Sequence, residues 1–124
     1  MRIRSRAMTV LAAAVLTGGG LTAVTSTPAS AATCYGSAKT YYTNDSWEWP
    51  VGGTYATATS NCTDINVKPT DRDMLVQTCF LKTGTCNGWH SLKKGTWGVA
   101  ATNVLSGTKF YLDFWGYSEG YVAY

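Results

Sequence analysis

Four cysteines in the later part of the chain, Cys34, Cys62, Cys79 and Cys86, constrain its fold more than any other feature. An even number of cysteines in a short exported chain predicts disulfide bonds, because a small domain has too little hydrophobic core to stay folded without help. Residues 79–86 read CFLKTGTC, which predicts a short hairpin with its two cysteines side by side. The pair Cys79–Cys86 leaves Cys34 with Cys62, so we expect two disulfides.

Export is indicated by the first residues of the chain. Three arginines lie within the first six residues, an uncharged apolar stretch covers residues 7–24, and small residues stand at Ala29 and Ala31. A basic head, an apolar middle and small residues at a cleavage position are the three parts of a secretory signal peptide. We therefore predict a signal peptide at residues 1–31 and a secreted protein at residues 32–124.

An uncleaved membrane anchor and a lipid anchor at Cys34 are the two alternatives to this interpretation. The glycines at 18–20 make the apolar stretch weak as a spanning helix, and no other stretch of the sequence is long and apolar enough to cross a bilayer. After cleavage we expect no attachment to a membrane.

The predicted secreted part is small and has no net charge. Cleavage after residue 31 of 124 leaves 93 residues, enough for one domain with one core. The ten basic residues include the three arginines of the signal, so seven remain against seven acidic residues. This balance gives no reason to expect a nucleic acid or an anionic membrane as partner.

The residue pattern after the signal predicts an all-β domain. Short runs of β-branched and aromatic residues are separated by Gly, Asn, Asp and Pro, and helical periodicity is missing. The clearest strand covers residues 108–115, in which Phe110, Leu112 and Phe114 alternate with polar and amphipathic residues. We expect these three side chains to lie in the core.

A second strand at residues 96–104 would place Trp97, Val99 and Ala101 on one face, buried with the first strand, and residues 105–107 would form the turn between the two. About seven short antiparallel strands with glycine turns predict a small sandwich or barrel. The other expected strands cover residues 53–60, 62–68, 74–81, 87–92 and 120–124.

Four segments stand out between residues 55 and 115, namely residues 60–68, 79–80, 86–89 and 107–111. They resemble segments of small secreted actinobacterial proteins of unknown function, a resemblance that implies export and a β-rich fold but no active site. The chain also resembles, at the level of the class only, the secreted amylase inhibitors, which are small β-sandwiches with two disulfides. Their Trp-Arg-Tyr recognition triplet is absent, and SWEW at residues 46–49 stands in a loosely similar place.

Residues suited to catalysis or metal binding are sparse. His90 is the only histidine, it lies beside Ser91 without a nucleophile-elbow motif, and paired cysteines leave no thiol nucleophile. No spacing selects a pair of carboxylates for glycoside hydrolysis, and zinc and EF-hand patterns are missing. We therefore predict no catalytic residue, no metal and no cofactor.

Aromatic residues are abundant, and some of them must be exposed. Five Trp, eight Tyr and three Phe all follow residue 31, more than a core of this size can hide. Trp47 and Trp49 flank Glu48 in a loop that ends at Pro50, and on an extended backbone their side chains would project on the same side. Such rings stack on sugars or anchor a protein partner. The alternative is that the pair closes one end of the core.

Asp64 and Asn66 form a second candidate site. They alternate with Ile65 and Val67, so we expect them to point together away from the core. They would form a small polar site or cap neighbouring turns.

These observations predict a secreted, non-catalytic binding or inhibitory module that acts on an extracellular protein or polysaccharide. A structural or envelope-associated secreted protein is the first alternative, and a small hydrolase is the second. The residues predicted to bind the ligand are Trp47, Glu48, Trp49, Asp64 and Asn66.

Overall fold

The computed structural model describes residues 29–124. The predicted signal peptide, apart from its last three residues, lies outside the described residues. Within 29–124 the chain forms one short helix and ten strands. Their bounds are α2 Ala29–Gly36, β2 Lys39–Tyr42, β3 Glu48–Trp49, β4 Ala56–Thr57, β5 Ile65–Pro69, β6 Met74–Phe80, β7 Thr85–Cys86, β8 His90–Leu92, β9 Gly98–Ala101, β10 Lys109–Phe114 and β11 Glu119–Ala123.

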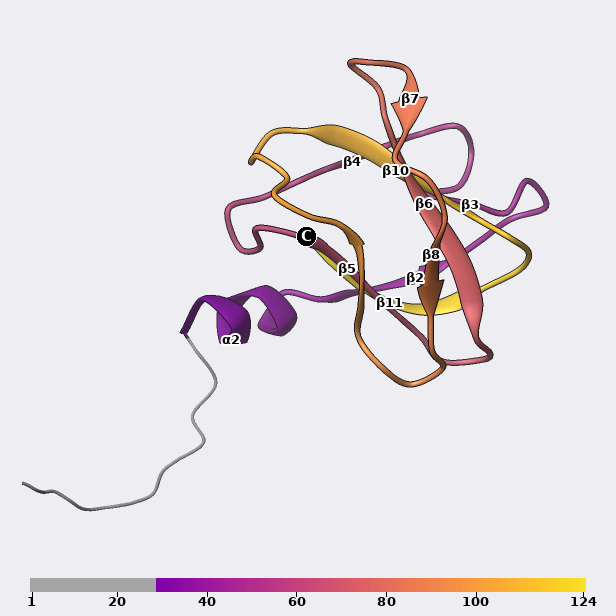
Figure 1. The fold of residues 1–124 in the computed structure, drawn as a ribbon, viewed down its shortest axis with the longest axis horizontal. Coiled ribbons are helices and arrows are strands. Elements are labelled where there is room, and N and C mark those ends of the chain that lie inside the picture. The colour runs from indigo at the N-terminus through magenta and orange to yellow at the C-terminus, as the bar shows by residue number, and fades with distance from the viewer. Residues whose placement is uncertain (1–28) are drawn as a thin grey trace, which may run out of the picture.

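The strands form two antiparallel sheets that enclose one main core (Figure 1). In the six-stranded sheet β10 pairs with β3, β4 and β6, and β6 pairs in turn with β7 and β8. The four-stranded sheet has the order β2-β11-β5-β9. The predicted all-β sandwich is therefore confirmed. No helix within residues 29–124 is long and apolar enough to span a membrane.

The alternation predicted for the strand at residues 108–115 is present in β10. Phe110, Leu112 and Phe114 are at most 1% exposed, while the residues between them face the other side of the sheet. Tyr41 of β2 stacks on Phe114 with ring centroids 5.1 Å apart, which joins the two sheets through the core. The central strand of the core was thus predicted correctly.

The face predicted for the strand at residues 96–104 was wrong in part. Val99 is 39% exposed and Trp97 is only partly buried, whereas Ala101 is buried as expected. The reason is that Leu92 packs closely against β9, since a Cβ added at Gly98 would lie 2.7 Å from Leu92 Cδ2. Close packing of this kind favours small residues on the core side of β9 and leaves a larger side chain outside.

The turn expected at residues 105–107 forms but does not join a hairpin. Thr108 N donates to Leu105 O at 3.1 Å, and Gly107 N donates to Ala58 O at 2.8 Å. However, β9 belongs to the four-stranded sheet and β10 to the six-stranded sheet. The turn therefore carries the chain from one sheet to the other.

Both predicted disulfides are present. Cys79 and Cys86 lie directly opposite each other in the β6–β7 hairpin, which projects at the top of Figure 1. Cys34 in α2 is bonded to Cys62, and this bridge ties the helix to the segment before β5. The hairpin reasoning from residues 79–86 therefore gave the correct pairing.

Candidate binding site

Trp47 and Trp49, predicted to face the same way, lie in different environments. Trp49 packs against the main core, opposite Leu112 in the β3–β10 pair and tilted on Tyr124 with ring centroids 5.9 Å apart. Trp47 is 50% exposed, and its φ of 63° is left-handed. The extended backbone expected through this segment was therefore wrong, and of the two rings only Trp49 helps to close the core.

A turn that begins at Asn44 explains the conformation of Trp47. Trp47 N donates to Asn44 O at 2.9 Å, and Ser46 N donates to Asn44 Oδ1 at 3.0 Å. Trp47 O then accepts from Phe114 N at 2.9 Å, which connects the turn to the six-stranded sheet. A left-handed conformation costs an L-residue about 1–2 kcal/mol, so these hydrogen bonds hold Trp47 in an unfavourable state.

Glu48 lies on the outer face of the six-stranded sheet. It is directly opposite Asp113, which alternates with the buried residues of β10 and so faces away from the core. Asp113 Oδ2 accepts from Gln77 Nε2 at 2.9 Å. The structure thus places Glu48 beside Asp113 and Gln77, and separates it from the core-packed Trp49.

Asp64 and Asn66, expected to point together away from the core, differ in burial: Asn66 is buried against the Cys34–Cys62 disulfide, and Asp64 is partly exposed. Both line a hollow of about 200 Å³ beside Cys34 and Cys62. Asn66 is 6% exposed, and its Nδ2 donates to Asp64 O at 3.2 Å. Asp64 Oδ1 accepts from Asn103 N at 3.0 Å. Because both side chains bond to backbone groups, their geometry favours the alternative in which they cap neighbouring segments.

Two tryptophans that the sequence reasoning did not select form the most exposed aromatic pair of the described residues. Trp115 directly follows β10 and is 64% exposed, and Trp89 directly precedes β8 and is 40% exposed. Their rings meet edge to face, with centroids 5.3 Å apart and an interplanar angle of 83°. Trp115 N donates to Leu75 O at 3.0 Å, which fixes the backbone of Trp115 against β6.

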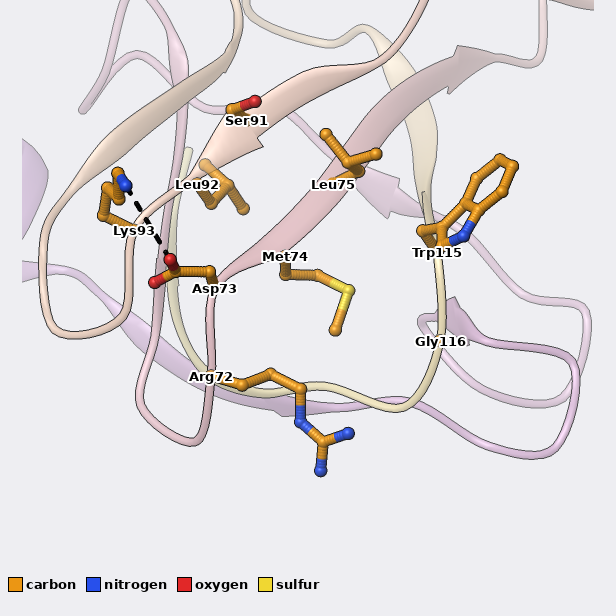
Figure 2. A pocket seen from close by; sticks show the side chains of 9 residues that line it. All are labelled: Arg72, Asp73, Met74, Leu75, Ser91, Leu92, Lys93, Trp115 and Gly116. Carbon is orange, nitrogen blue, oxygen red and sulfur yellow. Dashed lines mark ion pairs between the residues drawn. The ribbon is translucent and has the colours of Figure 1, made fainter.

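Trp115 forms one wall of a hollow of about 390 Å³, which we call the tryptophan hollow. Figure 2 shows Met74, Leu75 and Leu92 in its middle, with Trp115 on one side and the Lys93–Asp73 ion pair on the other. Met74 and Leu92 are buried, so the floor of the hollow is apolar and its rim is charged. The residues that line the tryptophan hollow are Arg72, Asp73, Met74, Leu75, Ser91, Leu92, Lys93, Trp115 and Gly116.

The charged groups at the rim are paired with each other. Lys93 Nζ lies 3.8 Å from Asp73 Oδ2, and Arg72 Nε lies 3.2 Å from Asp71 Oδ2. The side chains of Lys93, Asp73 and Arg72 are 79%, 65% and 60% exposed. Exposed ion pairs stabilise a fold by at most about 1 kcal/mol, so these groups can exchange a partner for a ligand at little cost.

His90 and Ser91, neighbours in the sequence, do not act as a pair in the structure. Both belong to β8, with His90 opposite Val76 and Ser91 opposite Leu75. Successive residues of a strand point to opposite faces, so the two side chains diverge. Ser91 lines the tryptophan hollow and His90 does not. Among residues 29–124, no three His, Cys, Asp or Glu side chains are grouped so that they could hold a metal ion.

Comparison of the chain with family models, with curated proteins and with solved structures found no significant match.

Proposed function

We propose that this domain is a secreted, non-catalytic binding module that holds an extracellular polysaccharide or protein at the tryptophan hollow. The observation that carries the proposal is the ring of Trp115, 64% exposed beside a hollow with an apolar floor and a charged rim. Sites of this kind combine apolar contact with a few polar groups that orient the ligand.

The exposed ring offers a useful binding energy. A tryptophan side chain has about 150–250 Å² of surface, of which Trp115 leaves roughly two thirds in water. If a ligand covers one face of the ring, about half of that exposed area is buried. At about 25 cal/mol per Å², this contributes roughly 1–2 kcal/mol from one residue.

Secretion is part of the same proposal. It is supported by the basic and apolar pattern of residues 1–31 and by two disulfides, which form and persist in oxidising compartments.

The proposal is tested by measuring binding of the purified protein to insoluble cellulose, chitin, starch and peptidoglycan, and to purified amylases and proteases. Trp115→Ala should abolish most of the binding to the target that is found, with an unchanged thermal melt because its ring is exposed. Leu105→Ala is the matched control, since Leu105 is 79% exposed but lies outside the hollow.

Trp47→Ala is the competing variant, because Trp47 is 50% exposed, second among the tryptophans to Trp115, and lies in the loop predicted from the sequence to bind a ligand. If Trp47→Ala loses binding while Trp115→Ala keeps it, the site is the loop at Asn44 to Trp49 and the proposed site is wrong.

A further inference from the structure

A second hollow lies on the outer side of the four-stranded sheet, over the paired strands β2 and β11. Its volume is about 320 Å³, and Tyr42, Tyr117, Tyr121, Thr70 and Glu119 are among the residues that line it. The three tyrosines are 59%, 46% and 41% exposed. We call it the tyrosine hollow.

The two hollows adjoin at consecutive residues of the chain. Trp115 and Gly116 line the tryptophan hollow, and Tyr117 lines the tyrosine hollow. Two residues span at most about 7 Å of extended chain, so the backbone positions that carry the two rings are close neighbours. On the other flank Thr70 lines the tyrosine hollow and Arg72 lines the tryptophan hollow.

Hydrogen bonds hold these two flanks together. Thr70 N donates to Glu119 O at 2.9 Å, and Glu119 N donates to Asp71 Oδ1 at 3.5 Å. The 70–72 turn is therefore attached to β11 at the boundary between the hollows. The two hollows thus border the same segment, residues 115–117, where the chain passes from the six-stranded to the four-stranded sheet, and we call them together the shared surface.

The charges along this surface are balanced by their neighbours. Arg72 is paired with Asp71, and Glu119 accepts from the Tyr117 hydroxyl at 3.2 Å, a contact that raises the pKa of Tyr117. Lys93 is paired with Asp73 at the far end, and Lys68 Nζ lies 5.6 Å from the centre of the Tyr121 ring, so three basic and three acidic side chains border the surface. A surface whose basic and acidic side chains are equal in number is poorly suited to a polyanion, and its hydroxyl, carboxylate and amine groups can bond to the hydroxyls of a neutral polymer.

We infer that the two hollows together bind a single uncharged polysaccharide chain, whose sugar rings stack on Trp115 in one hollow and on Tyr117 and its neighbours in the other. The inference rests on the proposed function, and it adds that the ligand is an uncharged polysaccharide and that one chain of it contacts both hollows. Rings separated by polar groups match a polymer in which apolar sugar faces alternate with hydroxyls. A chain that reaches both hollows binds more tightly than a short fragment, because its second contact is intramolecular.

The test uses protein purified after expression of the full chain, titrated by calorimetry with uncharged oligosaccharides of increasing length from cellulose, starch, mannan and chitin. Polygalacturonate serves as the anionic comparison. We expect one uncharged series to bind, with an affinity that rises with length until both hollows are occupied. For the longest fragments, Trp115→Ala and Tyr117→Ala should each weaken binding about tenfold, the ratio that corresponds to about 1.4 kcal/mol. Leu105→Ala should have no effect.

The outcomes separate the two proposals. If Trp115→Ala abolishes binding while Tyr117→Ala has no effect and affinity does not change with length, the shared surface is wrong and the binding module remains. The shared surface is also wrong, and the binding module also remains, if Trp115 is needed for binding but the protein binds only polygalacturonate, or only a purified amylase or protease. If no uncharged polysaccharide binds, the inference is overturned. Binding that survives Trp115→Ala in full overturns the proposed function as well.

Discussion

Replacing Phe110 by alanine tests the described core most directly. Phe110 is fully buried at the centre of the six-stranded sheet, paired with Phe80 on one side and Ala56 on the other. Its ring meets Tyr124 edge to face, with centroids 5.4 Å apart. The variant removes this contact and leaves a cavity between the two sheets, and truncation of a buried phenylalanine to alanine costs about 3–5 kcal/mol.

That cost is large for a domain of this size. Small domains have free energies of unfolding of about 5–15 kcal/mol in total, so the variant loses a large share of its stability. In a domain of 60–100 residues, 1 kcal/mol lowers the Tm by about 4–8 °C, so we expect a fall of at least about 12 °C. Circular dichroism melts of Phe110→Ala and the parent, with both disulfides intact, measure the difference.

Leu105→Ala is again the control, because it also truncates an apolar side chain to alanine, but one that is 79% exposed. Its effect should stay within about 0.5 kcal/mol. If Phe110→Ala unfolds at the same temperature as the parent, the register of β10 is wrong, and with it the assignment of the core face.

Three further variants or measurements test other parts of the structure. Gly120→Ala would drive a Cβ into the backbone of β5 at Lys68 O, so we expect a loss of about 2–3 kcal/mol or more; an unchanged denaturation midpoint would contradict the pairing of β11 with β5. Asn87→Ala removes the hydrogen bonds to Thr78 N at 2.8 Å and to Ala100 O at 2.7 Å, and should cost about 1–3 kcal/mol in the same assay, since Thr78 N loses its acceptor while Ala100 O keeps only the Thr78 hydroxyl. Intact mass of protein from the culture medium should show a chain that starts at Ala32; a full-length species in the membrane fraction would refute the predicted cleavage.

The parts of the fold that were predicted from sequence are those that depend on local pattern. The buried face of β10 follows from strict alternation around Phe110, Leu112 and Phe114, and the pairing of Cys79 with Cys86 follows from a tight turn. The buried face of β9 was harder to predict, because it depends on packing against Leu92, which belongs to another strand. No local pattern indicates that Val99 would be the exposed residue there.

The candidate site was missed for a similar reason. Alternation places Trp115 on the outer face of its strand, but its partner Trp89 lies 26 positions earlier in the numbering. The two rings meet only because β8 and β10 both pair with β6, and strand order is not readable from the sequence. The extended backbone expected at Trp47 was wrong because the hydrogen bonds of Asn44 turn this backbone into a left-handed conformation.

A buried polar network fixes the backbone that carries the exposed rings at the boundary between the hollows. Ser118, which follows Tyr117, is fully buried, and its backbone N donates to Thr43 Oγ1 at 3.0 Å. Thr43 N donates to Ser118 O at 3.0 Å, and the hydroxyls of Tyr41 and Ser118 share a hydrogen bond of 2.8 Å.

Burial raises the pKa of Tyr41 well above its ordinary value, so its hydroxyl stays neutral and keeps this bond even at a pH where an exposed tyrosine ionises. Since a satisfied buried network is rigid, the segment from Trp115 to Ser118 is fixed at both ends, by Leu75 O at one end and by Thr43 at the other. A backbone held in this way loses little conformational freedom when a ligand covers the rings that it carries, and a larger share of the contact energy appears as affinity.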